Sequence, residues 1–278
     1  MLRDRSGRWG GVTTKSRTSP RSWSDRRLNP DHRLGLRLTL ASLAAFLVLV
    51  PFAGLLALVE TKWGPLERLD EDATRTLNEY VLDHRGFVHP LQATSYIFHA
   101  WVFRLIIGGL AIWLFVRGAR RLAVWAMTTL VVGGLLGLLF KVVVDRPRPD
   151  LESPIAHAPG GSFPSGHAMT AALGCLVIVL ILLPVIPASW RKAVWAVAAV
   201  VAVAAGFCRV ALGVHYVSDV LAGWVFGLAV VIATTTAFET WRRSEGRAPA
   251  TPAIEGVEPE AAPEIAPSGD PSKAPDRT

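Results

Sequence analysis

Long apolar stretches constrain this chain more than any other feature of its sequence. Six segments are apolar over roughly the 20 residues that a helix needs to cross the hydrocarbon core of a bilayer. They are residues 38–59, 97–116, 122–140, 168–186, 193–210 and 217–238. The sequence therefore predicts an all-α, polytopic membrane protein with six transmembrane helices.

Composition supports this class and indicates the domain limits. Hydrophobic residues make up 51% of the chain and charged residues only 18%, a balance typical of membrane proteins. Residues 1–35 and 244–278 lack apolar periodicity. We expect them to be a basic tail and a Pro/Ala/Glu-rich tail, both disordered, on either side of a membrane domain over residues 36–243.

Two features between the first helices leave alternatives open. Arg104 interrupts the second apolar segment, and we expect its side chain to extend to the membrane surface from near a helix end. Residues 66–82 carry leucines and valine at roughly helical spacing. This pattern fits an amphipathic helix on the membrane surface, and it fits a solvated helix packed on neighbouring loops equally well.

Lysines and arginines on the short loops predict the topology. If six helices alternate, the basic stretches 117–121, 191–192 and 242–243 fall on the same side as the basic N-terminal tail. That side is expected to be the cytoplasm, with both termini in it. The other loops then face outward, at 60–96, 141–167 and 211–216.

The charge of the chain bears on partners and location. A net charge of +7 could indicate a nucleic-acid partner, but the basic tail directly precedes a membrane span and suits an anionic cytoplasmic leaflet better. We therefore expect no nucleic-acid partner. The first apolar run lacks a small-residue cleavage site, so no cleavable signal peptide is expected. Arginine far outnumbers lysine and alanine is abundant, which favours the plasma membrane of a bacterium with a GC-rich genome.

The first polar cluster follows the third apolar segment. Lys141 ends that segment, and Arg146 and Arg148 each precede a proline, which favours an extended and stiff backbone. Lys141 and Arg148 could converge on one anion, lysine as a point charge and arginine as a fork. The alternative for Lys141 is an anchor at the lipid headgroups.

The second cluster, Ser165, Gly166 and His167, stands where the fourth helix should begin. Backbone N–H groups at a helix start, with the serine hydroxyl and the helix dipole, favour a bound phosphate. His167 on the first turn could exchange a proton with such a group. Taken alone, Ser165 would simply be a helix cap and His167 an interfacial polar residue.

The third cluster lies between the last two segments. Arg209 ends the fifth segment, and His215 and Asp219 are four residues apart, so they share one face of a helix. The carboxylate can then hold one imidazole nitrogen and leave the other free to attack as a nucleophile. A plain ion pair at the helix start is the alternative.

Together these clusters resemble the three motifs of the type 2 phosphatidic acid phosphatase (PAP2) superfamily of integral membrane lipid phosphatases, which shares its site with vanadium haloperoxidases. The family patterns are K-x6-R-P, P-S-G-H and S-R-x5-H-x3-D. In this sequence they read KVVVDRPRP from Lys141, PSGH from Pro164 and CRVALGVHYVSD from Cys208. Cys208 departs from the family serine, so one hydroxyl contact to phosphate is expected to be missing, with a slower rate or a shifted preference.

The resemblance implies a role for each residue. His215 attacks phosphorus to form a phosphohistidine, Asp219 orients it, and His167 protonates the leaving oxygen and then activates water. The phosphate oxygens are held by Lys141, Arg148, Ser165, Gly166 and Arg209. Positioning and charge neutralisation dominate phosphoryl transfer, and three cations can do this without a metal, so we expect no cofactor.

The expected substrate is a lipid phosphate or diphosphate whose tail stays in the bilayer, such as phosphatidic acid, phosphatidylglycerol phosphate or undecaprenyl diphosphate. The active site is expected at the extracytoplasmic helix ends. Two alternatives are a non-catalytic membrane protein or transporter that binds anionic lipid, and a vanadate-dependent haloperoxidase-like enzyme. The sequence does not indicate the lipid or the oligomeric state.

Overall fold

The computed structural model describes residue 46 and residues 49–266, and this part of the chain contains helices and no strand. Four helical stretches are long and apolar enough to cross a membrane, namely Arg85–Arg117, Arg120–Val144, Ala188–Ala211 and Val217–Ser244. Two shorter apolar helices are Leu49–Glu60 and Gly166–Leu182. The described part is thus all-helical, and the protein is an integral membrane protein. Residues 38–45, 47 and 48 of the expected first span and the expected tail 1–35 lie outside the described residues.

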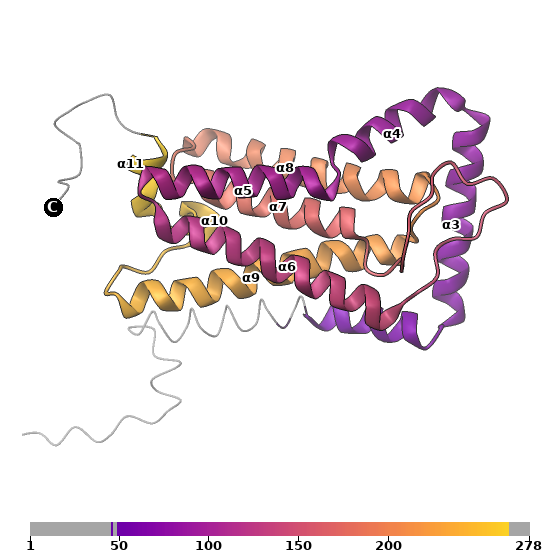
Figure 1. Cartoon of the computed structure of the whole chain (residues 1–278), viewed down its shortest axis with the longest axis horizontal. Coiled ribbons are helices and arrows are strands. Elements are labelled where there is room, and N and C mark those ends of the chain that lie inside the picture. The colour runs from indigo at the N-terminus through magenta and orange to yellow at the C-terminus, as the bar shows by residue number, and fades with distance from the viewer. Residues whose placement is uncertain (1–45, 47–48, 267–278) are drawn as a thin grey trace, which may run out of the picture. The chain divides into compact units, whose positions relative to one another are not determined.

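The helices follow one another along the chain as labelled in Figure 1. The larger ones are α3 (Gly64–Asp83), α4 (Val88–Ile97), α5 (Ala100–Arg117), α6 (Arg120–Val144), α7 (Gly166–Leu182), α8 (Ala188–Ala211) and α9 (Val217–Ser244). A 3-10 turn, η1 (Arg85–Phe87), joins α3 to α4. Short C-terminal elements follow as α10 (Pro252–Glu255), η2 (Pro259–Ala261) and α11 (Ala262–Ile265).

Helix α7 forms the centre of the bundle. Its sequence is apolar on every face, which is typical of a helix enclosed by others, and α5, α6, α8 and α9 all pack against it. Helix α9 approaches most closely, through two glycines. A Cβ on Gly223 would lie 2.7 Å from the Ser165 carbonyl oxygen, and one on Gly227 would lie 2.7 Å from that of Met169. The two backbones therefore touch, and this contact holds the start of α7 against the start of α9.

Helix α3 confirms the helix expected over residues 66–82, but it buries a different face. Its buried residues include Asp70, Thr74 and Asn78, a polar stripe at four-residue spacing, whereas Leu69 is 56% exposed. This stripe packs on α8 and α9. The spacing of the leucines predicted the helix but not which of its faces is buried. Asp70 lies on the buried face because it pairs with a cation from a distant part of the chain, and the spacing does not reveal that partner.

The segment after α9 corrects one expectation. Residues 244–278 were expected to be disordered, yet 252–265 form helical turns that pack on the bundle. Val257, Ala261 and Ile265 are buried, and the Glu260 carboxylate receives two hydrogen bonds from Arg242 at 2.6 and 2.8 Å. Apolar side chains at four-residue spacing supply the packing. They are few within a Pro/Ala/Glu-rich segment, so the sequence pattern did not indicate them. Residues 267–278 lie outside the described part.

Candidate active site

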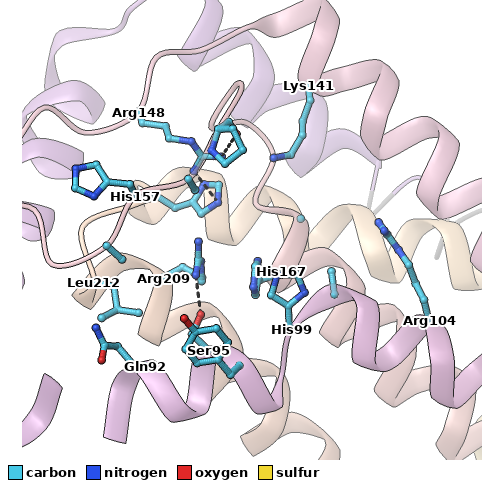
Figure 2. Close-up of a pocket in the computed structure, with 17 residues that line it drawn as sticks. Gln92, Ser95, His99, Arg104, Lys141, Arg148, His157, His167, Arg209 and Leu212 are labelled. Atoms are coloured by element: carbon cyan, nitrogen blue, oxygen red, sulfur yellow. Dashed lines mark hydrogen bonds between the residues drawn. The ribbon is translucent and has the colours of Figure 1, made fainter. Parts of the chain in front are cut away.

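A pocket of about 430 Å³ lies where α6 and α8 end and where α5 and α7 begin (Figure 2). Six of the eight residues predicted for the site line it. They are Lys141, Arg148, Gly166, His167, Arg209 and His215. The other two, Ser165 and Asp219, are fully buried, and the backbone N–H of Ser165 donates to the Asp219 carbonyl at 2.9 Å. This bond joins the second predicted cluster directly to the third.

Arg148 is held in place by backbone carbonyls. Its Nη1 donates to Val214 at 2.7 Å, and its other nitrogens donate to the carbonyls of Pro159, Gly160 and Gly161 at 3.0–3.3 Å. The same Nη1 lies 3.3 Å from His215 Nε2. Burial lowers the pKa of Arg148, and Asp219 opposes this shift. An arginine nonetheless stays charged, so a fixed cation stands beside the imidazole.

Lys141 and Arg209 bring two further cations to the pocket. Lys141 Nζ donates to the Gly161 carbonyl at 3.2 Å, and Arg209 Nη1 donates to Ser95 Oγ at 2.6 Å. The Nε of Arg209 is buried and finds no partner among the described residues. Lys141 thus lines the pocket, and Arg209 keeps an unpaired donor in the described part of the chain.

The start of α7 leaves two polar atoms unsatisfied. Ser165 occupies the N-cap position, but its hydroxyl makes no capping bond. Ser165 Oγ and His167 Nε2 are both buried without a hydrogen-bond partner in the described part of the chain. Buried polar atoms are nearly always paired in folded proteins, so two orphans at a helix start point to a bound anion that would satisfy them.

His215 and Asp219 lie together, but their contact is loose. The His215 ring is 2% exposed, and its Nδ1 is 3.5 Å from Asp219 Oδ2, longer than a usual hydrogen bond. Asp219 Oδ2 instead accepts from the Tyr216 backbone N–H at 2.9 Å. Burial lowers the pKa of His215 to about 4, although Asp219 acts in the opposite direction. The ring is therefore neutral at neutral pH, the form that a nucleophile needs.

Sequence reasoning missed a buried ion-pair chain behind the pocket. Arg146 Nη1 donates to Asp219 Oδ1 at 2.7 Å, and its Nη2 donates to Asp70 Oδ2 at 2.9 Å. Asp70 also accepts from the backbone N–H and the hydroxyl of Ser218. Burial alone would lower the pKa of Arg146, but the two carboxylates outweigh it and raise the pKa. Arg146 was recognised only as a cation beside the motif, and no spacing linked it to Asp70.

Sequence reasoning also missed the wall that α4 and the start of α5 contribute. Gln92, Ser95, Tyr96, His99 and Arg104 all line the pocket. Arg104 was expected near a helix end, reaching the membrane surface; it is exposed, lies close to the start of α5, and also lines the pocket. Its isolation was an available signal, because a charged residue within an apolar helix usually faces a cavity or the bundle interior.

We predict strong coupling between Asp70 and Arg146. Either Asp70→Ala or Arg146→Ala leaves a buried charge unpaired and should lower the free energy of unfolding by about 3–5 kcal/mol. In the double variant, the free energy of unfolding should fall by less than the sum of the two single losses, and the difference should be about 0.5–3 kcal/mol. Denaturant unfolding in detergent measures all three, and Asp72→Ala on the exposed side of α3 is the matched control. Additive losses would show that the pair is not energetically coupled.

We also predict an unusual titration of His215. Its pKa of about 4 in the folded protein lies below the ordinary value of about 6.5. As pH falls from about 6.5 to 4, the unfolded chain takes up a proton that the folded chain does not, so the free energy of unfolding decreases over this range. NMR of ¹⁵N-histidine-labelled protein, with His215→Asn to assign the signal, measures the midpoint. A midpoint at pH 6 or above contradicts a desolvated ring.

Part of the chain is similar to a known family. Residues 122–243 match the model of the PAP2 superfamily. Phosphatidylglycerophosphatase B of Bacillus subtilis is 44% identical over 96 residues, which are 34% of this chain and 47% of that protein. Lipid A 1-phosphatase of Rhizobium etli is 35% identical over 112 residues, 37% and 44% of the two chains. Undecaprenyl-diphosphatase of Sulfolobus acidocaldarius is 29% identical over 122 residues, which are 42% of this chain and 55% of that protein.

A solved structure is similar over more of the chain. The crystal structure of a transmembrane PAP2-type phosphatidylglycerolphosphate phosphatase from Bacillus subtilis superimposes with a TM-score of 0.61 and 28% identity, covering 72% of this chain and 98% of that one. The matched segment spans about half the length of the curated relatives. Residues 122–243, which carry all three motifs, are thus similar to the PAP2 superfamily.

Proposed function

We propose that this protein is a membrane phosphatase that hydrolyses a lipid phosphate or lipid diphosphate through a phosphohistidine. One observation carries the proposal: a buried, neutral imidazole, His215, faces a pocket in which Lys141, Arg148 and Arg209 converge. A nucleophile without a competing proton and a set of fixed cations are what phosphoryl transfer requires. A protein that only binds anionic lipid needs the cations but not this histidine.

The geometry supports Nε2 of His215 as the attacking atom, because Nδ1 faces Asp219 and Nε2 faces the pocket beside Arg148. Nε2 forms a bond to phosphorus as the bond from phosphorus to the leaving oxygen breaks. His167 gives a proton to that oxygen. Water then attacks the phosphohistidine while His167 takes the water's proton, which releases phosphate and restores both rings.

The remaining residues would neutralise the charge on the phosphate oxygens. Lys141, Arg148 and Arg209 supply full charges, while the free Ser165 hydroxyl and the Gly166 N–H supply dipoles at the start of α7. Cys208 is fully buried, its thiol donates to the Ala205 carbonyl at 3.3 Å, and it does not line the pocket. Its replacement of the family serine therefore removes no group from the pocket wall, which argues against a large effect on rate.

The relatives support a lipid substrate. Their names specify phosphatidylglycerol phosphate, the 1-phosphate of lipid A and undecaprenyl diphosphate, which share a phosphate attached to a membrane-embedded group. A pocket at the ends of apolar helices suits such a molecule, because the tail stays in the bilayer while the phosphate enters among the cations. The chemistry common to the three relatives is phosphate release from a lipid.

We predict metal-independent phosphate release that depends on His215. Purified protein in detergent with EDTA should release phosphate from at least one of phosphatidic acid, phosphatidylglycerol phosphate and undecaprenyl diphosphate. His215→Ala should lower the rate by at least about a thousandfold, because it removes the nucleophile. The three cations Lys141, Arg148 and Arg209 support independence of metal, because they can neutralise the phosphate charge that a metal would otherwise neutralise.

His89→Ala is the matched control for that variant, since His89 is an exposed histidine of α4 outside the pocket. Unchanged release from His215→Ala would eliminate this mechanism. Release abolished by EDTA and restored by a divalent cation would refute metal independence. No release from any of the three lipids would favour the lipid-binding alternative.

We further propose that the pocket faces outward in a bacterial plasma membrane, that six helices span the bilayer and that both termini are cytoplasmic. The basic turns 117–121, 191–192 and 242–243 lie at the helix ends opposite the pocket, which is the cytoplasmic end by the positive-inside rule. Both native cysteines are buried, so introduced cysteines can report topology. An impermeant maleimide should label Ser153→Cys in intact spheroplasts and Ser244→Cys only after permeabilisation. The reverse pattern would invert the topology.

A further inference from the structure

The pocket has a wall that the three motifs do not supply. Arg104 and His99, both from the start of α5, belong to it. Figure 2 shows Arg104 on the other side of the His99 and His167 rings from Arg148 and His157. In this view Arg148 and Arg104 thus lie on different sides of His167.

Arg104 is an exposed arginine near the start of α5, and its side chain lines the pocket. It is the one charged residue of α5 before the terminal Arg117. No hydrogen bond or ion pair engages it anywhere in the described residues, in contrast to Arg148 and Arg209. An arginine within an apolar membrane helix is costly, and such residues face water-filled cavities and mark binding paths.

His99 adds a neutral donor next to this cation. Its Nδ1 accepts a hydrogen bond from the Trp101 backbone N–H at 3.3 Å, so a neutral ring carries its proton on Nε2. The ring stands edge-on to His167, with centroids 4.4 Å apart. An N–H donor therefore lies directly beside the group that, in the proposed reaction, protonates the leaving oxygen.

The charge of the pocket exceeds what one phosphate needs. Four lining residues carry a full positive charge, and none of the described residues that line the pocket is Asp or Glu. They are Arg104, Lys141, Arg148 and Arg209. A phosphomonoester carries about 1.5 to 2 negative charges at pH 7, which leaves about two positive charges unmatched. A substrate with a second phosphate would match them.

We propose that Arg104 and His99 form a subsite for a second phosphate group of the substrate, one that is not transferred and lies on the leaving-group side. This inference rests on the proposed function, because the position of His167 defines that side. It narrows the substrate class to lipids with two phosphates. The second phosphate can be attached directly, as in a lipid diphosphate, or through a spacer, as in phosphatidylglycerol phosphate.

Steady-state kinetics of the full chain in detergent test the subsite. Undecaprenyl diphosphate, phosphatidylglycerol phosphate and phosphatidic acid are compared for wild type, Arg104→Gln, Arg104→Lys and Arg75→Gln. Arg75 is an exposed arginine of α3 outside the pocket and serves as the matched control. In Arg104→Gln, the ratio of kcat/KM for a two-phosphate lipid to that for phosphatidic acid should fall about ten- to a hundredfold, the loss expected for a charged hydrogen bond.

The fall should appear mainly in KM, Arg104→Lys should retain part of the preference, and Arg75→Gln should leave the ratio unchanged. A fall for the diphosphate alone assigns a directly attached second phosphate, and a fall for phosphatidylglycerol phosphate alone assigns a spaced one. A ratio that Arg104→Gln leaves unchanged for both lipids overturns the subsite.

A binding measurement keeps this test separate from the proposed function. Calorimetry on His215→Ala protein compares inorganic pyrophosphate with orthophosphate, and Arg104→Gln is then added to the same protein. Pyrophosphate should bind at least about tenfold more tightly, and Arg104→Gln should remove that advantage. If wild type hydrolyses none of the lipids, the proposed function fails and this comparison alone decides the subsite. The subsite proposal is overturned if pyrophosphate binds no more tightly than orthophosphate, or if its tighter binding persists in Arg104→Gln.

Discussion

The arrangement of the site depends on Arg146, which bridges two buried carboxylates from different parts of the chain. Asp70 comes from α3 and Asp219 from the start of α9, and both are fully buried. Two buried carboxylates close together would repel each other strongly, and the guanidinium between them removes this cost by pairing with both. Because Asp219 is also the neighbour of His215, the packing of α3 and the position of the imidazole follow from one cation.

Much of the fold could be predicted from the sequence, because membrane helices can be recognised as long apolar segments. The four long apolar helices of the structure agree with four of the expected segments. Contacts between distant polar residues could not be predicted in this way. Asp70 looks like any exposed acid of an amphipathic helix, and only its place opposite Arg146 distinguishes it. The C-terminal turns were missed for a similar reason, since Val257 and Ile265 are too few to stand out within their polar surroundings.

Residues from all three motifs line one pocket, because the motifs lie at helix ends that alternate in direction and so meet at one end of the bundle. The sequence could not predict what completes the pocket. His99 and Arg104 carry no motif, and their inclusion depends on how α5 packs against α7. Local spacing likewise placed Asp219 near His215 but could not foresee that its oxygens would bond to Arg146 and Tyr216.

The glycine contact between α7 and α9 has a mechanical consequence. With backbone on backbone at Gly223 and Gly227, no side chains stand between the two helices to change rotamer and let one slide past the other. The contact therefore limits how far Ser165, at the start of α7, and His215, just before α9, can shift relative to each other.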